Sequence, residues 1–360
     1  MAMNKPKVTI LWLNHNSSGI LDIVLESLRG VAELDYENYE LIVIDNASTD
    51  GSFEAIRRFI EESGLRAKTR IVRNERNLGF ARAVNIGFRA RSRDSKYVAL
   101  LNNDAVPVSE SLRTLVEVLE ANPKLGAVQG VMMHYHDRSV VDSAGGYVNR
   151  YLLAFRFLAG TRYRLKHPVY ISYADGAYSV YRIAAVKDAM RGDRLFLDEF
   201  FAYCDDNVLG FLLWAKGWRI ASVPVTTAYH VRGATFGRVS PERTYNMFAC
   251  ASFLLGVTRG VPLDVRAYRL YLLTRRILST ALARRGFITP RLLLDAWRYG
   301  RSTASKYRGR LLIDYRSIPK VMLRPKDIPY LLFTLKHFNP NKSHDFVRET
   351  VERHRADIVF

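Results

Sequence analysis

The sequence has few cysteines, and this scarcity narrows the class of protein. Two cysteines in 360 residues, Cys204 and Cys250, exclude a small fold held together mainly by disulfides. They lie far apart and lack the spacing of a metal site, so we assign them no chemistry. This usage fits a reducing compartment.

The sequence also lacks long apolar runs. Residues 8–13 form an apolar run that is too short for the core of a signal peptide. The longest nearly uncharged apolar stretch, residues 247–257, falls well short of the roughly 20 residues that a membrane-spanning helix needs. We therefore expect a cytoplasmic protein whose membrane contact is peripheral, at the cytoplasmic face.

Acidic residues are scarce in the last third of the chain. The net charge is +19, and residues 241–360 hold 23 lysines and arginines against 9 aspartates and glutamates, a balance of +14. Such a region attracts anionic surfaces, and phosphate on lipid, on a lipid-linked substrate or on nucleic acid satisfies it equally well. No recognised nucleic-acid motif accompanies this charge, so we expect no nucleic-acid partner.

The N-terminal part alternates short β-branched runs with amphipathic segments. The expected strands are residues 8–13, 41–44, 70–73 and 97–101, and the expected helices are residues 20–28, 53–62 and 81–91. This alternation is typical of βαβ units and predicts an α/β fold with a mainly parallel sheet flanked by helices.

Polar residues follow three of the predicted strands. Asn14, Asp45 and Asp104 each lie at or just beyond a strand's carboxyl end. Ligands of open parallel sheets bind outside these ends, so we place the site there. Taken alone, the segment 45–51 also fits an ordinary strand–turn–helix junction, and Asn102-Asn103-Asp104 an ordinary turn. Asp104 is also suited to a hard divalent cation whose remaining ligands are phosphate oxygens.

Residues 198–206 combine aromatic residues with paired carboxylates. A partly dehydrated acid such as Asp205 or Asp206 has a raised pKa, which suits a general base that deprotonates a sugar hydroxyl. Capping of the following helix is the alternative reading, and both roles are compatible. His230, considered alone, is more often structural than a ligand.

In their order and separation these segments resemble the large inverting family-2 glycosyltransferases of the GT-A fold, a nucleotide-diphospho-sugar transferase fold, and especially the rhamnosyltransferase-like branch. The resemblance covers about residues 7–240. It is carried by residues 8–14, 45–51, 74–85, 102–104, 176–177 and 200–206 and by His230.

The resemblance implies a role for each matching residue. Asp206 is the implied catalytic base, with Asp205 beside it, and Asp104 holds Mg²⁺ or Mn²⁺ against the diphosphate in a site that His230 completes. Asp45 contacts the nucleotide base. The remaining residues expected to bind the nucleotide sugar are Asn14, Asn77, Gly79, Arg82 and Asn103.

The sequence departs from the family pattern in three places. An Asp205-Asp206 pair stands where the family has Glu-Asp, and Val208 and Leu212 replace an acid and an arginine on the following helix. Arg82 and Ala83 replace a glycine pair, and Arg82 is a candidate to reach the diphosphate.

The sequence leaves the substrates and some alternatives open. The leading donors are deoxythymidine-diphosphate rhamnose and a uridine-diphosphate hexose, and the expected acceptor is a glycan or a lipid-linked molecule. A binding protein without transfer activity and a nucleic-acid-binding protein are the main alternatives. A sugar-nucleotide oxidoreductase or nucleotidylyltransferase would share the α/β architecture but fits poorly, and a dinucleotide fingerprint is absent because no Gly-x-Gly-x-x-Gly follows the first strand.

We expect a catalytic domain over residues 1–240 and a basic, mainly helical C-terminal region over residues 241–360. In that region Leu270, Leu273, Ile277 and Ala281 fall on one helical face flanked by arginines. Such a helix lies on a membrane surface, forms a dimer contact or packs against the catalytic domain.

Overall fold

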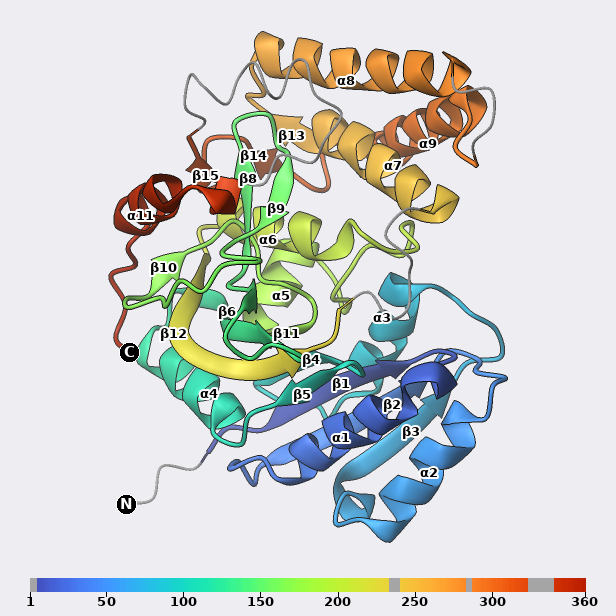
Figure 1. Cartoon of the computed structure of the whole chain (residues 1–360), viewed down its shortest axis with the longest axis vertical. Coiled ribbons are helices and arrows are strands. Elements are labelled where there is room, and N and C mark those ends of the chain that lie inside the picture. Colours follow the sequence, from blue (N-terminus) through green and yellow to red (C-terminus); the bar gives the residue numbers. More distant parts are fainter. Residues whose placement is uncertain (1–4, 233–239, 283–286, 323–339) are drawn as a thin grey trace.

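A ten-stranded mixed sheet forms the centre of the protein (Figure 1). The computed structural model describes residues 5–232, 240–282, 287–322 and 340–360. The main path of the sheet runs β10-β12-β6-β11-β4-β1-β2-β3, with β5 paired to β12 and β7 to β6. Its strands are β1 Val8–Asn14, β2 Tyr39–Asp45, β3 Thr69–Arg73, β4 Tyr97–Asn102, β5 Ala105–Pro107, β6 Leu125–His134, β7 Val141–Ser143, β10 Val169–Tyr170, β11 Tyr178–Arg182 and β12 Arg219–His230.

The strands predicted in the N-terminal part form the parallel side of this sheet. Strands β3, β2, β1 and β4 are parallel neighbours, whereas β11 runs antiparallel to both β4 and β6. The helices of this part are α1 Leu21–Ala32, α2 Ser52–Glu62, α3 Phe80–Ala90, α4 Ser111–Ala121, α5 Ile183–Met190 and α6 Asp205–Ala215, with short 3₁₀ turns η1 Ser18–Ile20 and η2 Arg66–Lys68. The four strands and three helices expected from periodicity are confirmed, with shifts of a few residues at their ends.

Both faces of the parallel strands β1, β2 and β4 are buried because helices cover each of them, whereas the edge strand β3 is partly exposed. Alternate residues of a strand point to opposite faces. Leu41 of β2 accordingly belongs to the core cluster that contains Val24 of α1, whereas Ile42 belongs to the cluster that contains Phe88 of α3. The polar ends of these strands lie at the border of this apolar core, and Asn14 and Asp45 there are themselves fully buried.

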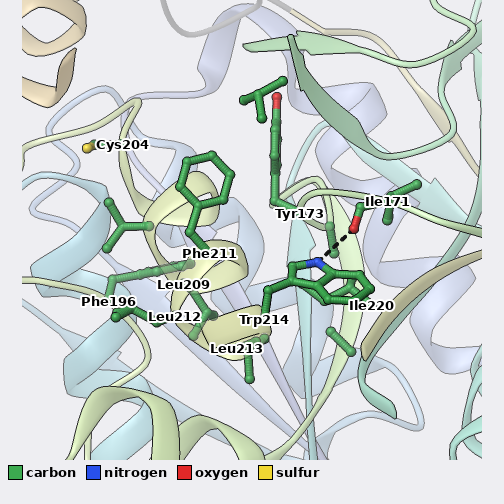
Figure 2. Packing of buried hydrophobic residues seen from close by; sticks show 14 of the residues in the cluster. Ile171, Tyr173, Phe196, Cys204, Leu209, Phe211, Leu212, Leu213, Trp214 and Ile220 are labelled. Carbon is green, nitrogen blue, oxygen red and sulfur yellow. Dashed lines mark hydrogen bonds between the residues drawn. The ribbon is translucent and has the colours of Figure 1, made fainter. Parts of the chain in front are cut away.

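Helix α6 anchors the second half of the core. Five apolar residues in its last two turns, Leu209, Phe211, Leu212, Leu213 and Trp214, lie in this packed cluster (Figure 2). The indole nitrogen of Trp214 donates to the carbonyl oxygen of Ile171 at 3.0 Å, which satisfies the one polar group of that side chain. Because a helix is rigid, this packing of its last two turns also fixes the position of the first turn of α6.

The C-terminal region is mainly helical and packs on the side of the molecule away from β3 (Figure 1). Its helices are α7 Pro241–Val257, α8 Leu263–Leu282, α9 Pro290–Tyr307, η3 Pro340–Lys342 and α11 His344–Arg353. Its short strand β14 Ile313–Asp314 pairs with β13 Thr258–Arg259. Its short strand β15 Lys320–Val321 pairs with β8 Gly146–Asn149 and so completes a three-stranded sheet that also contains β9 Ala154–Arg156.

This region shares a core with the rest of the chain. Ala249 and Phe253 of α7 belong to the same buried cluster as Phe196 and Phe200. The division near residue 240 that the composition suggests coincides with the start of α7, which Ser240 caps by accepting from the backbone N–H of Arg243 at 3.1 Å. Two separate domains at this point stay a prediction.

Among the described residues, no helix is both long enough and apolar enough to cross a membrane.

Candidate active site

Asn14, the last residue of β1, is the centre of a buried polar cluster. Its side-chain nitrogen donates to Asp45 Oδ1 at 3.0 Å and to the hydroxyl of Ser48 at 3.0 Å. Its side-chain oxygen accepts from Ser17 at 2.5 Å and from Asn103 at 3.1 Å. The register of β1 against β2 places Asn14 directly beside Asp45, so the sheet itself brings the ends of three strands together.

Asp45 is fully buried and held from two sides. The backbone N–H of Ser48 donates to Asp45 Oδ2 at 3.1 Å, and Arg73 Nε lies 3.4 Å from the same oxygen. The Arg73 side chain also donates to the carbonyl oxygen of Ser48 at 3.1 Å. Both oxygens of this buried carboxylate are thus engaged within the protein, and its contact with a nucleotide base stays a prediction.

The segment that follows β3 is fixed to the end of β2 by amide side chains. Asn46 Nδ2 donates to Asn77 Oδ1 at 2.8 Å, and Asn74 Nδ2 donates to Asn46 Oδ1 at 3.0 Å. Asn77 Oδ1 also accepts from the backbone N–H of Gly79 at 2.9 Å. Asn77 and Gly79 therefore line the same strand end as Asn14 and Asp45, as the resemblance implied.

Gly79 brings this segment against the acid-rich loop. Its φ is +80°, and a Cβ atom there would lie 2.8 Å from the carbonyl oxygen of Phe201. The next residue, Phe80, donates its backbone N–H to that same carbonyl at 2.8 Å. Only glycine accommodates both the backbone conformation and the close approach.

Arg82 lies along the same contact. Its Nε donates to the carbonyl oxygen of Asp198 at 2.7 Å, while one helical turn further on Asn85 donates to the Asp198 carboxylate at 2.8 Å. Arg82 is otherwise exposed, so in this structure it holds the acid-rich loop, and its proposed reach to a diphosphate stays a prediction.

Asp104 and His230 lie together because β12 ends beside β5. In the antiparallel pairing of these strands His230 is opposite Ala105, the residue after Asp104. His230 Nε2 lies 3.1 Å from Asp104 Oδ1. The two residues that the resemblance assigned to one metal site are thus adjacent, although 126 positions apart.

A buried charge network extends from this pair. His230 Nδ1 lies 2.9 Å from Asp142, and Arg232 donates to Asp142 and to Asp175, each at 2.8 Å. Burial by itself lowers the pKa of His230, but its hydrogen bonds with Asp104 and Asp142 raise that pKa to about 9. Burial raises the pKa of Asp142, yet His230 and Arg232 together hold it well below its usual range. At neutral pH His230 and Arg232 are therefore cations, and each is paired with buried carboxylates.

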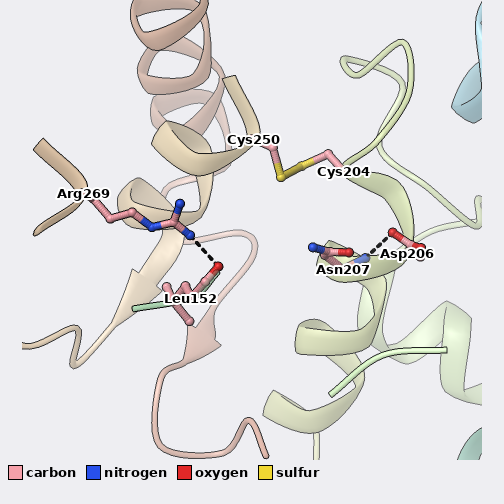
Figure 3. Close-up of a disulfide and its surroundings, with 6 residues drawn as sticks. All are labelled: Leu152, Cys204, Asp206, Asn207, Cys250 and Arg269. Carbon is pink, nitrogen blue, oxygen red and sulfur yellow. Dashed lines mark hydrogen bonds between the residues drawn. A yellow bond between two sulfur atoms is a disulfide. The ribbon is translucent and has the colours of Figure 1, made fainter. Parts of the chain in front are cut away.

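The acid pair occupies the first turn of helix α6, but the predicted capping role is wrong, because the N-cap residue is Cys204 and no side chain caps this helix. The buried Asp205 has an Oδ1 without a hydrogen-bond partner among the described residues, and burial, then the charge of Asp206, raises its pKa well above the ordinary value. Burial and the charge of Asp175 also raise the pKa of Asp206, to about 7, although the backbone of Asn207 and Gly176 partly offsets them. Asp206 is partly exposed and accepts from the Asn207 backbone N–H at 2.9 Å (Figure 3). Its carboxylate is suited to accept a proton near neutral pH.

The few protein ligands available at Asp104 fit a divalent cation that takes most of its ligands from a bound substrate. Within the residues that the structure describes, no group of three or more His, Cys, Asp or Glu side chains forms a metal cage. Asp104 contributes one oxygen to His230, and its other carboxylate oxygen makes no hydrogen bond with a described residue. Mg²⁺ and Mn²⁺ in nucleotide sites need few protein ligands because phosphate oxygens supply the others.

The sequence analysis missed three members of this site. Asp142, Asp175 and Arg232 carry no motif of their own, and the two aspartates lie 90 and 57 positions from Arg232. The signal that the sequence offered for any of them was that Asp175 directly precedes Gly176-Ala177, a segment that carries the family resemblance. Conversely, Val208 and Leu212, which depart from the family pattern, are each 2% exposed and pack in the core.

The cysteines are also joined, contrary to the sequence analysis. Cys204, the residue before the acid pair, forms a disulfide with Cys250 of α7, with Cα atoms 5.5 Å apart (Figure 3). Assigning them no chemistry was wrong, because the fold brings together two residues separated by 46 positions. Disulfides are unusual in a reducing compartment, so this pair makes the cytoplasmic location testable.

This sheet, with its polar strand ends, carboxylate–histidine pair and helix-start acid, is the architecture of a nucleotide-sugar transferase of the GT-A fold. The sequence signature described as glycosyl transferase family 2 matches residues 9–188, and the chain belongs to this family.

Two curated relatives are similar over part of the chain. An uncharacterised glycosyltransferase of Haemophilus influenzae is 31% identical over 125 residues, which cover 35% of this chain and 36% of that protein. A poly-β-1,6-N-acetyl-D-glucosamine synthase of Staphylococcus aureus is 25% identical over 240 residues, which cover 66% of this chain and 52% of the synthase. The chain thus spans a third to a half of the length of these relatives.

Two solved structures share the fold. A mannosyltransferase from Pyrobaculum calidifontis, in complex with GDP-Man and Mn²⁺, superposes with a TM-score of 0.52 at 18% identity and covers 86% of this chain and 88% of its own. GalNAc-T7 with UDP, GalNAc and Mn²⁺ gives a TM-score of 0.58 at 14% identity, covering 85% of this chain and 58% of its own. These likenesses confirm the GT-A fold expected from the sequence.

Proposed function

We propose that this protein transfers a sugar from a nucleoside-diphosphate sugar to a hydroxyl group of a glycan or lipid-linked acceptor, with inversion at the anomeric carbon. The observation that carries the proposal is the placement of Asp206, an acid whose pKa burial raises to about 7, within electrostatic influence of Asp175 and Arg232, which belong to the charged network that leads to the Asp104–His230 pair. A base and a cation-binding acid in one region of the protein are the two groups that a single displacement needs.

The donor occupies the ends of the parallel strands. Asp45 contacts the nucleotide base, and Asn14, Asn77, Asn103 and the backbone at Gly79 line the nucleotide pocket. The contacts of Asn14 with Asp45 and Asn103 support this assignment because they hold the three strand ends in one fixed arrangement. Arg82 borders this surface and also fixes the acid-rich loop.

Asp104 and His230 would hold Mg²⁺ or Mn²⁺ on the donor diphosphate, where the cation neutralises the charge of the leaving group, provided that His230 gives up its Nε2 proton when the cation binds. The Mn²⁺ in the two structural neighbours supports this assignment. The chain's own contribution is to keep the pair in place, since Asp142 holds the imidazole of His230 in its orientation.

Asp206 accepts the acceptor's hydroxyl proton while that oxygen bonds to the anomeric carbon and the bond to the diphosphate breaks. Displacement from the opposite face inverts the configuration in one step. Asp205 stays protonated beside it, because burial and the neighbouring charge raise its pKa well above the ordinary value.

Among donors, deoxythymidine-diphosphate rhamnose and a uridine-diphosphate hexose remain our choices from the sequence, and the GDP-Man of one neighbour adds a guanosine donor to those worth testing. The proposal includes a role in a polysaccharide, glycolipid or protein glycosylation pathway and a cytoplasmic location. It also includes a contact of the C-terminal region with a membrane surface or with a second copy of the chain.

The test is release of nucleoside diphosphate from a panel of nucleotide sugars with Mg²⁺, Mn²⁺ or EDTA, with membrane extract as the source of acceptor. The proposal expects metal-dependent turnover of one donor, with the product's anomeric configuration inverted by NMR. Absence of turnover with every donor would contradict it and favour a sugar-nucleotide-binding protein.

A further inference from the structure

The three helices α7, α8 and α9 enclose a cavity that the transfer reaction does not use. Its volume is about 450 Å³, within the range of small-molecule sites. A second cavity of about 270 Å³ shares residues with the first and extends it toward the end of α9. Apolar side chains, Leu255, Leu270 and Trp297, form much of the wall of the larger cavity.

The charge in these cavities is of one sign. Arg266, Arg301 and Arg308 line the larger cavity, and Arg259 lines the smaller one together with Arg266 and Arg308. Among the described residues no carboxylate lines either cavity. None of these four arginines forms an ion pair with a described residue. By contrast, Arg298 and Arg291 on the same α9 helix both lie within 3.7 Å of Asp295.

An apolar stripe on α8 adjoins the larger cavity. Leu263, Leu278 and Leu282 are 84%, 57% and 81% exposed, and Leu270, which lines the cavity, is 51% exposed. At 3.6 residues per turn these four leucines fall within about a third of the helix circumference, opposite the buried Val265. The stripe thus faces outward, and α8 lies at the edge of the molecule (Figure 1). The single apolar face that the sequence predicted through Leu270 and Leu273 is divided in the structure. Leu270 is exposed, whereas Leu273 is buried in the helix packing.

We propose that the cavity between α7, α8 and α9 binds the phosphate group of an anionic membrane phospholipid while the leucine stripe of α8 enters the adjoining lipid surface. Guanidinium groups bind phosphate oxygens in a bidentate manner, so unpaired arginines beside apolar walls match a phosphate attached to an apolar chain. A helix with an outward apolar stripe lies at the boundary between headgroups and acyl chains. The site goes beyond the transfer reaction, and its binding step needs no nucleotide sugar.

A second copy of the chain is the competing occupant of the stripe. A two-fold contact through α8 would bring Arg266 and its neighbours of both copies together, because the same surface meets itself. Without carboxylates in the cavities this contact leaves like charges unpaired, whereas a phospholipid surface supplies the opposite charge. The charge of the site therefore favours lipid.

Flotation of the full chain with vesicles tests the proposal. The vesicles contain phosphatidylcholine alone or phosphatidylcholine with phosphatidylglycerol. The site variant carries Arg266→Gln, Arg301→Gln and Arg308→Gln, and a control of equal charge carries Arg291→Gln, Arg298→Gln and Arg348→Gln at side chains 92%, 78% and 66% exposed. Thermal melting of each variant checks its fold.

We expect the parent chain to float only with the anionic vesicles. The site variant should bind them at least tenfold more weakly than the control of equal charge, because the control removes only general attraction. Leu278→Gln should weaken binding more than Met247→Gln, a change at a 46% exposed residue of α7.

Three results would overturn the proposal. They are no flotation of the parent chain, equal loss in the two arginine variants, or a dimer in light scattering that Leu278→Gln dissociates without any vesicle binding. Release of nucleoside diphosphate, measured on the same samples, separates failure of this site from failure of the proposed transfer activity.

Discussion

The hydroxyl group of Tyr307 in α9 lies 2.8 and 2.7 Å from the two carboxylate oxygens of Glu199, six residues before Asp205. Arg194 donates to the same hydroxyl at 3.2 Å, and burial, then the bond to Glu199, raises the pKa of Tyr307 to about 12. Tyr299 of the same helix donates to the backbone carbonyl of Glu199 at 2.6 Å. The C-terminal region thus fixes the loop that leads to the proposed base.

We predict that Tyr307→Phe lowers the free energy of unfolding by about 1 kcal/mol and reduces kcat more than it changes the KM for donor. The reason is that the loop carrying Asp205 and Asp206 loses a support, whereas the strand ends that bind the nucleotide keep theirs. Denaturant titration and initial rates measure the two effects. Tyr163→Phe is the control, because its hydroxyl makes no hydrogen bond with a described residue, and equal kcat loss in both variants would contradict the account.

Gly79→Ala should weaken donor binding. At φ +80° an alanine is strained by about 1–2 kcal/mol, and its Cβ would meet the Phe201 carbonyl at 2.8 Å. The loops around the donor must therefore separate, which raises the KM for donor severalfold. Gly64→Ala is the control, since no atom lies within 4 Å of the added Cβ there. An unchanged KM in Gly79→Ala would show that this contact does not shape the donor pocket.

Loss of the disulfide should destabilise the protein without abolishing donor binding. The bond between Cys204 and Cys250 closes a loop of 46 positions, and such a cross-link contributes roughly 2–4 kcal/mol. Cys250→Ala and the reduced parent chain should melt at similar temperatures, both below the oxidised parent. Two free thiols in the protein isolated from its cell without reductant would instead support the reducing compartment expected from the sequence.

The activity should rise with pH around neutrality. Asp206 accepts a proton only as a carboxylate, and burial together with Asp175 raises its pKa to about 7, so kcat falls as the pH drops through that value. Because the pKa of Asp206 is higher in the folded protein than in the unfolded chain, its ionisation lowers the stability of the fold. This loss develops as the pH rises from the ordinary pKa of an aspartate and is complete above about pH 7. Asp206→Asn should therefore raise the melting temperature more at about pH 8 than at about pH 4. A kcat profile flat from about pH 5 to 8 would contradict this base.

The N-terminal elements were predictable because their signals are local. Apolar periodicity defines β1 to β4 and α1 to α3, and a polar residue at the end of a buried strand indicates where the ligand binds. Asn14, Asp45 and Asp104 could be placed at one edge for that reason. The local pattern of paired carboxylates beside aromatic residues offered Asp205 and Asp206 as candidates, and the family resemblance singled out Asp206 and added His230, which no local pattern assigns.

The rest of the site depends on pairings between distant segments. The mixed half of the sheet arises where β11 enters between β4 and β6, and no local pattern specifies that order. Arg232 bridges Asp142 and Asp175 only because β12 ends beside β7 and the turn before β11. The cysteine pair likewise follows from the packing of α7 on the start of α6.

The central claim, that Asp206 is the base of a metal-dependent sugar transfer, is tested most directly by turnover of three proteins, the parent chain, Asp206→Asn and Asp104→Ala. Each protein is assayed with the donor that the parent chain uses, membrane extract and Mn²⁺. We predict that both variants lose at least a hundredfold in kcat, that EDTA abolishes the parent activity, and that Asp206→Asn still binds the nucleoside diphosphate with Mn²⁺. Turnover by Asp206→Asn close to that of the parent would contradict the assignment of Asp206 as the base, and with it the proposed displacement.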